Sequence, residues 1–346
     1  NKLFIHTGLQ VNMESSMLLV AAKVSVGKDL AWWKKIIQNL EDIISLEDEL
    51  LPFLHDPDNY INSKDEDVSR LFEEKVFEII GQPYVDKSPK ILAREVVKLL
   101  FDGLLNNSVP DPLMNLYYKW VDSNTYSSSL KAYIERYKIN PSTNVWDVNP
   151  DHCFEEIDIK ALQDITANLQ NKDFIGEKLI KIKERAKTVK VKNFVPQWWN
   201  DVITILEFNS KLLSLCTSWN QLISFYTTRF CKVDRAIRNL YTSFLHDEKI
   251  IRPLQEYYEN LNSELLQQWF ELANEYKTDQ QGYLVDVFKS ADPGIAVIVG
   301  DGVRYEIADH IADSIEKQFK VERNFMIADI PSETEHNMSA LYVGNN

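Results

Sequence analysis

The stretch IAVIVGDGVRYEIADHI (residues 295–311) decides the predicted fold, because the hydrophobic pattern of the chain changes within it. Its first five residues are all apolar and mostly β-branched, which is typical of a parallel strand buried on both faces. The run stops at Asp301, Gly302 follows, and a helix is predicted from about residue 303 to 319. Strand, sharp turn and helix predict the opening of an α/β unit. Ligands of such sheets bind beyond the carboxyl ends of the strands, where Asp301 falls.

The predicted helix has one apolar face that we expect to pack on the sheet. The residues of this face recur at four-residue spacing, namely Ile307, Ile311, Ile315 and Phe319. A second strand is predicted at FMIADI (residues 325–330), and the polar turn after it leads into another helix that starts at Thr334.

Thr334 has two interpretations. It is an ordinary N-cap residue, whose oxygen accepts hydrogen bonds from the first backbone N–H groups of the helix, or it is a nucleophile whose charge those groups and the helix dipole stabilise. If the two predicted strands lie side by side, Asp301 and Thr334 meet at one edge of the sheet. One divalent ion could then contact both oxygens and activate the hydroxyl.

The chain before this region is predicted to be helical. From Leu30 to about Leu284 the apolar residues recur every three or four positions, as one face of a helix requires. Breaks rich in Pro, Asn, Asp and Gly occur near residues 138–152 and 289–294. We therefore predict a helical region at 1–138, a second helical region at 139–289, and the beginning of an α/β domain at 290–346.

Composition limits the classes of function. The 346 residues are 45% hydrophobic and 26% charged, with a formal net charge of −14, which disfavours a broad surface that grips nucleic-acid phosphates. A local exception is KLIKIKERAKTVKVK (178–192), which is either a solvated helix face or a strip that binds an anion or a partner. No apolar run reaches the roughly 18 residues of a membrane span and the first residues lack a signal-peptide pattern, so we expect a cytoplasmic protein without membrane contact.

Two predictions concern side chains inside the helical part. Asp234 and Arg238 in VDRAIRNLYTSF are at helical spacing, which predicts an ion pair. Paired aromatic residues are predicted to fill the space between helices rather than to stack bases; they include Trp32, Trp33, Trp120, Trp198, Trp199 and Trp269.

VIVGDGVRYEIADHI followed by ADIPSETEHNMSALY resembles the start of a PglZ domain, a branch of the alkaline phosphatase superfamily found in BREX phage-defence systems. That branch typically has Asp-Ala-Leu-Arg-Tyr-Glu, then Leu-Pro-Ser-x-Thr and Met-x-Ala-Leu. The matching residues are Asp301, Arg304, Tyr305, Glu306, Pro331, Ser332, Thr334, Met338, Ala340 and Leu341. The chain departs from the pattern at Gly302, Val303, Glu333 and Asn337. The helical segment YTTRFCKVDRAIRNLYTSF also resembles the region that precedes the phosphatase domain in this family.

The resemblance implies roles for particular residues. Asp301 would be a metal ligand, and Thr334 would be the nucleophile and a ligand of the same metal. We assign Arg304 and Asn337 to contact with the substrate or to support of the ligands. The implied cofactor is a divalent metal, zinc first, with manganese or magnesium as alternatives. Family members complete two metal sites with Asp and His residues further along, which His336 alone does not replace, so we expect this chain to be inactive.

The implied function is that of a metal-dependent phosphatase or phosphodiesterase in a BREX-type antiphage defence system. The helical part would then be a protein-docking module whose partners are other BREX proteins, with DNA contacted indirectly. Two alternatives stay open. The chain is a non-catalytic scaffold that assembles defence components, or it is a nucleic-acid-binding helical module that uses residues 178–192.

Overall fold

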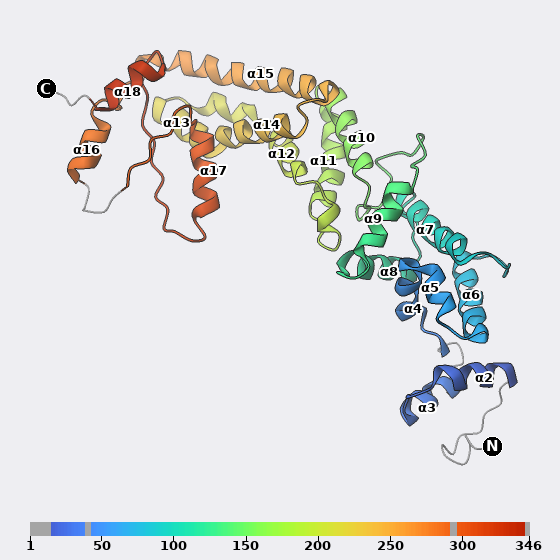
Figure 1. Ribbon diagram of the computed structural model, residues 1–346. Coiled ribbons are helices and arrows are strands. Elements are labelled where there is room, and N and C mark those ends of the chain that lie inside the picture. Colours follow the sequence, from blue (N-terminus) through green and yellow to red (C-terminus); the bar gives the residue numbers. More distant parts are fainter. Residues whose placement is uncertain (1–14, 39–42, 291–295, 343–346) are drawn as a thin grey trace. The chain divides into compact units, whose positions relative to one another are not determined.

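The computed structural model describes residues 15–38, 43–290 and 296–342, and this part of the chain is mainly helical, as predicted (Figure 1). It divides into two compact units. Unit 1 consists of Asn1–Lys160 with Lys187–Val195, and unit 2 consists of Ala161–Ala186 with Pro196–Asn346. The predicted break at 138–152 lies inside unit 1. The predicted break at 289–294 falls largely on residues 291–295, which are outside the described residues.

Unit 1 is an assembly of short and medium helices. Their bounds are α2 Ser15–Val24, α3 Leu30–Gln38, α4 Leu46–His55, α5 Pro57–Asn62, α6 Glu66–Ile80, α7 Pro89–Leu105, α8 Asp111–Asp122 and α9 Ser127–Arg136. Helix α6 illustrates how local sequence sets these bounds. The Asp65 carboxylate accepts from the Asp67 backbone N–H at 3.2 Å and caps the start. Gly81, in the left-handed conformation with φ +70°, ends the helix.

One hydrophobic core holds unit 1 together. The aromatic residues Tyr117 and Trp120 of α8 are fully buried in it. The Trp120 indole Nε1 donates to the Tyr126 carbonyl oxygen at 2.9 Å, so its polar atom is satisfied. Trp199 of unit 2 is also buried. For these residues the prediction of aromatic core packing is confirmed, and each such side chain contributes on the order of 1.5–3 kcal/mol.

Unit 2 is built around helix α14. Its helices are α11 Lys172–Ala186, α12 Trp198–Leu206, α13 Trp219–Phe225, α14 Cys231–Ser243, α15 Glu248–Glu271, α16 Tyr283–Ser290, α17 Tyr305–Ile315 and α18 Thr334–Tyr342, while α10 Glu155–Ala167 has residues in both units. Helices α12, α15 and α17 all pack on α14 (Figure 1). The apolar residues of α14 that face these neighbours include Val233, Ile237 and Leu240, all buried.

The basic run at 178–192 is split between the two units. In unit 2, Lys183 is paired with Glu207, and Arg185 is buried. In unit 1, the Lys190 ammonium lies 4.1 Å from the centre of the Tyr118 ring, a cation–π contact. Several charges of this run are therefore engaged within the protein.

Neither predicted strand forms in the described residues. Ile295 lies outside them, residues 296–299 have no ladder partner, and the Ile298 side chain is 92% exposed. Residues 325–330 are also irregular. An apolar, β-branched run indicates burial, but a strand exists only where a neighbouring strand supplies the hydrogen bonds.

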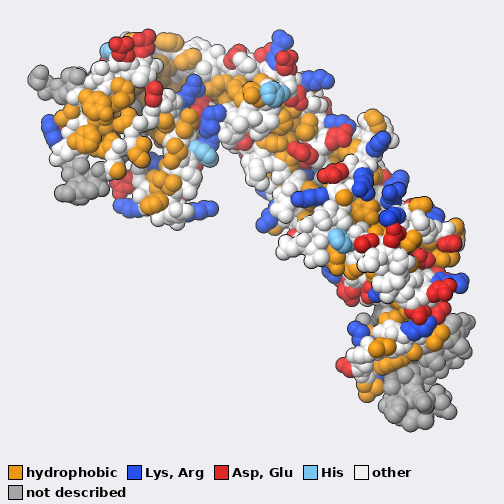
Figure 2. All heavy atoms as spheres, viewed as in Figure 1, with side chains coloured by type: hydrophobic (Ala, Val, Ile, Leu, Met, Phe, Trp, Pro, Cys, Tyr) orange, Lys and Arg blue, Asp and Glu red, His pale blue; other side chains and the backbone are white. Residues whose placement is uncertain are grey.

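Helix α17 packs with a different face from the one predicted. Ile311 and Ile315 and the following Phe319 are exposed, whereas Glu306 and Asp309 are buried. The acidic face contacts α14 instead, because that helix presents two arginines to it. Hydrophobic side chains gather on the surface over α16, α17 and α18 (Figure 2).

Candidate functional site

Asp301 and Thr334 are in direct contact. The Thr334 Oγ1 hydroxyl donates to the Asp301 Oδ1 carboxylate oxygen at 3.0 Å, and both side chains are exposed. Gly302, with φ +66°, turns the chain directly after Asp301. Thr334 is the first residue of α18, as predicted. The structure thus brings together the two residues predicted as metal ligands, although no sheet edge carries them among the described residues.

Gln280 fixes the segment that leads to Thr334. Its side chain is 3% exposed, donates from Nε2 to the Asn337 carbonyl oxygen at 2.7 Å, and accepts from the Asp329 backbone N–H at 2.8 Å. The same segment is bonded to Thr278, whose hydroxyl donates to the Ile327 carbonyl oxygen at 2.9 Å. Sequence reasoning missed Gln280, because a single Gln in a polar loop carries no pattern.

Asn337 supports the turn before α18. Its Nδ2 donates to the carbonyl oxygens of Pro331 at 3.0 Å and Glu333 at 3.1 Å. Its Oδ1 is buried and has no hydrogen-bond partner among the described residues. The predicted contact of Asn337 with substrate stays a prediction, and the structure gives the residue a positioning contact one helical turn after Thr334.

A second acidic group also lies in this region. The Asp329 Oδ2 atom is 3.3 Å from His336 Nε2. The backbone N–H of Ile330 first, and His336 second, hold the pKa of the Asp329 carboxyl below its usual value. Asp329 is therefore an ionised carboxylate close in sequence to Thr334, which the sequence analysis did not single out.

Arg304 lies on the wall of a cavity of about 670 Å³ in unit 2. Ser332 also lines it, so the cavity adjoins the segments that carry Asp301 and Thr334. Much of the remaining wall is aromatic or aliphatic, including Tyr226, Leu222, Tyr258, Leu265, Trp269, Tyr276, Tyr305 and Met326. A concave apolar pocket with a few convergent polar groups is the usual form of a small-molecule site.

Asp234 is one of the polar residues in the wall of this cavity. It accepts from the Tyr226 hydroxyl at 2.9 Å and from the Tyr258 hydroxyl at 2.8 Å. Burial raises the pKa of the Asp234 carboxyl, and the two tyrosine hydrogen bonds and the charge of Arg304 act against that rise. The predicted Asp234–Arg238 pair is therefore wrong, because Asp234 turns to the tyrosines while Arg238 Nε lies 3.4 Å from Glu306 Oε1.

The described residues do not by themselves make a metal centre. No three His, Cys, Asp or Glu side chains converge within them as a metal-binding group. Asp301 and Thr334 supply two oxygens, whereas a zinc site takes three or four protein ligands.

Comparison with models of protein families, with curated proteins and with solved structures finds no match to this chain. Among its described helices, none is long and apolar enough to cross a membrane.

Proposed function

We propose that Asp301 and Thr334 belong to a site that hydrolyses phosphoesters. The observation that carries the proposal is the 3.0 Å hydrogen bond between the Thr334 hydroxyl and the Asp301 carboxylate. These residues lie in separate sequence motifs that both resemble the PglZ pattern, and their contact is what a shared site requires.

With this function we propose that residues 290–346 are the first part of an α/β phosphatase-like domain. The exposed apolar face of α17 supports this, because Ile311 and Ile315 lie on one side of the helix without a cover among the described residues. Ile298 and Ile330 are likewise exposed. Apolar groups in such numbers favour burial, and a sheet formed with further strands would cover them.

The chain's own residues suit the first step of such a hydrolysis. The Thr334 oxygen would attack phosphorus as the ester P–O bond breaks, and the departing alcohol would take up a proton equivalent to the one that Thr334 gives up. Water would then hydrolyse the phosphothreonine, which restores the hydroxyl and releases the phosphate product. Asp301 already accepts the hydrogen bond of the Thr334 hydroxyl, so it orients that proton toward the carboxylate. Arg304 on the cavity wall would attract the phosphate charge. The proposed cofactor is a divalent metal, zinc first, with manganese or magnesium as alternatives, in a protein that supplies the remaining ligands.

The proposed setting is a BREX-type antiphage defence system, in the cytoplasm. Other BREX proteins are the proposed partners, and DNA would be reached through them. This part of the proposal rests on the sequence resemblance.

The 346-residue chain should show no metal-stimulated hydrolysis of bis(4-nitrophenyl) phosphate. Asp301 and Thr334 offer two oxygens at this place, and no group of three His, Cys, Asp or Glu side chains converges among the described residues, whereas a zinc site takes three or four protein ligands. The measurement is release of nitrophenolate with added zinc, manganese or magnesium, on a sample of verified mass. Robust turnover would contradict the view that this site needs further ligands.

A second candidate is a docking module formed by the helical part. Unit 1 favours it, because the buried residues of one hydrophobic core all come from the residue ranges of that unit and none from unit 2. Residues 15–288 expressed alone, which keep the core residues Val20 and Ala21 of α2, should therefore unfold cooperatively on heating and co-purify with a co-expressed BREX protein. A molten product by circular dichroism, or a folded one that captures none of the BREX proteins, would count against this candidate.

A further inference from the structure

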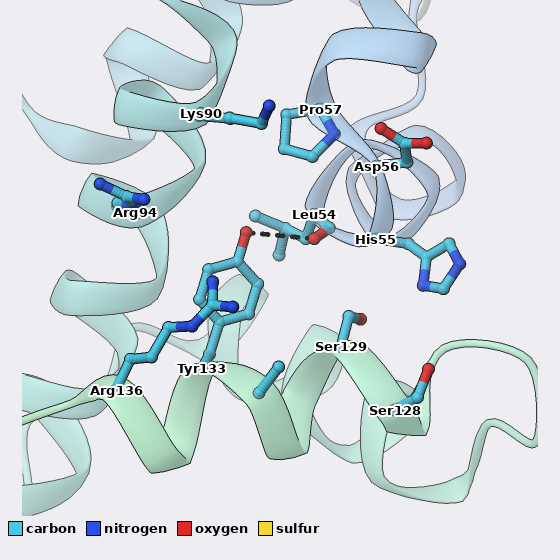
Figure 3. Close-up of a pocket in the computed structure, with 11 residues that line it drawn as sticks. Leu54, His55, Asp56, Pro57, Lys90, Arg94, Ser128, Ser129, Tyr133 and Arg136 are labelled. Atoms are coloured by element: carbon cyan, nitrogen blue, oxygen red, sulfur yellow. Dashed lines mark hydrogen bonds between the residues drawn. The ribbon is translucent and has the colours of Figure 1, made fainter.

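Unit 1 contains a pocket that is separate from the site of Asp301 and Thr334. It has a volume of about 350 Å³ and lies between the corner of α4 and α5, helix α7 and helix α9 (Figure 3). Tyr133 of α9 stands at its centre, and its hydroxyl donates to the Leu54 carbonyl oxygen at 3.2 Å. Because this bond joins α9 to α4, the floor of the pocket is fixed by the fold.

Three cations line this pocket. Lys90 and Arg94 project from α7 and Arg136 from the end of α9 (Figure 3). Lys90 is paired with Asp58 at 2.5 Å, whereas neither arginine has a hydrogen-bond or ion-pair partner within the described residues. Asp56 is the acidic residue of the lining, and its carboxylate accepts from the backbone at the start of α5. The two guanidinium groups therefore carry charge that the protein does not neutralise.

Both arginines act on the same ring. Burial raises the pKa of the Tyr133 hydroxyl, and the charges of Arg94 and Arg136 each oppose that rise. Both guanidinium-bearing residues line the same pocket as this ring (Figure 3). In a chain of net charge −14, two unpaired like charges gathered at one pocket are an arrangement that a bound anion would stabilise.

We propose that this pocket binds the phosphate group of a small phosphorylated molecule. A guanidinium presents a planar fork of N–H donors that matches phosphate oxygens in a bidentate manner. Arg94 and Arg136 provide two such forks, and the exposed Ser128 hydroxyl adds a further donor on the other side of the pocket (Figure 3). The volume is at the lower end of the roughly 300–1,000 Å³ of ligand pockets, so it suits a small ligand better than a nucleic-acid strand.

The test uses pyrophosphate as the probe and isothermal titration calorimetry on the 346-residue chain at constant ionic strength. The wild type should bind pyrophosphate, and the double variant Arg94→Gln/Arg136→Gln should bind it at least about tenfold more weakly. The matched control is Lys131→Gln/Lys138→Gln, which removes two positive charges from exposed positions outside this pocket and should leave the dissociation constant within about twofold of wild type.

Three results would overturn the proposal. The first is that both double variants bind pyrophosphate equally weakly, and the second is that the wild type shows no detectable binding of pyrophosphate. The third is that a single strand of twelve nucleotides binds more tightly than pyrophosphate and loses affinity in the same Arg94 and Arg136 variants. If the double glutamine variant does not fold, as judged by circular dichroism, the single variant Arg94→Gln carries the same test. The proposal does not depend on hydrolysis at Thr334, so either can fail alone.

Discussion

Arg235→Ala should release α17 from α14 and lower the free energy of unfolding by about 3 kcal/mol, the lower end of the cost of breaking a buried pair. The Arg235 guanidinium donates to Asp309 at 2.5 Å and to Asp313 at 2.7 Å. Asp309 is 8% exposed, so its carboxylate would lose its closest cation while it stays out of water. Arg323 would remain on the outer side, at 3.1 Å. Denaturant unfolding gives the free energy, and hydrogen exchange of residues 305–315 reports the release of the helix.

The control for this prediction is Arg252→Ala on α15. Arg252 is also paired with an acidic residue, Glu256 at 3.1 Å, but its side chain is 82% exposed. Exposed pairs at this spacing contribute about 0.3–0.5 kcal/mol, so the same substitution should change stability very little. Arg235→Lys should restore part of the loss, since a lysine ammonium does not span two carboxylates as a guanidinium does. Equal losses in Arg235→Ala and Arg252→Ala would contradict a special role for Arg235.

The same contact has a pH signature. Arg235 first, and then Arg323, hold the pKa of the Asp313 carboxyl below its ordinary value of 3.8. A carboxyl with a lowered folded-state pKa contributes stability that is present above its unfolded pKa and is lost as the pH falls. Below about pH 3.8 the wild type should therefore lose this contribution, and Arg235→Ala should show a shallower loss in the same range.

Helices were predictable from the sequence because their signals are local. The three- and four-residue spacing of apolar residues, a capping residue such as Asp65 and a terminating Gly81 all lie within a few positions of the helix they define. The start of α18 at Thr334 was predicted for the same reason. Strands carry less local information, since an apolar run such as 295–299 does not contain the partner that would pair with it.

The face that α17 presents to α14 was mispredicted, although the sequence contains a relevant signal. Arg235 and Arg238 are three residues apart on α14, and Glu306 and Asp309 are three residues apart on α17. Opposite charges at equal helical spacing on two helices are complementary, whereas the spacing of the isoleucines on α17 indicates an apolar face but not which neighbour covers it. Gln280 had no such signal, because its role depends on two backbone groups at residues 329 and 337.

In a protein that completes the proposed site, Thr334→Ala should lower phosphoester hydrolysis by about 10⁴-fold or more, since it removes the attacking oxygen. Asp301→Ala should have an effect of similar size for a separate reason, because it removes both the partner of the hydroxyl and a carboxylate proposed to hold the metal. Metal content by mass spectrometry should therefore fall further in Asp301→Ala than in Thr334→Ala. Thr334→Ser keeps a hydroxyl at the start of α18 and should retain partial turnover.

Turnover measured together with stability separates these roles from the ordinary alternative for Thr334. An N-cap threonine contributes about 1 kcal/mol, and its loss leaves turnover nearly intact. In this structure the hydroxyl donates to Asp301, which lies outside the helix, so Thr334→Ala should cost at most the roughly 0.5–1.5 kcal/mol of a hydrogen bond. Thr334→Val serves as a second variant, since it keeps the β-branched shape and removes only the hydroxyl. In a protein that completes the site, wild-type turnover of Thr334→Val would rule out Thr334 as the nucleophile. The contact with Asp301 leads us to expect loss of turnover there, with nearly unchanged stability.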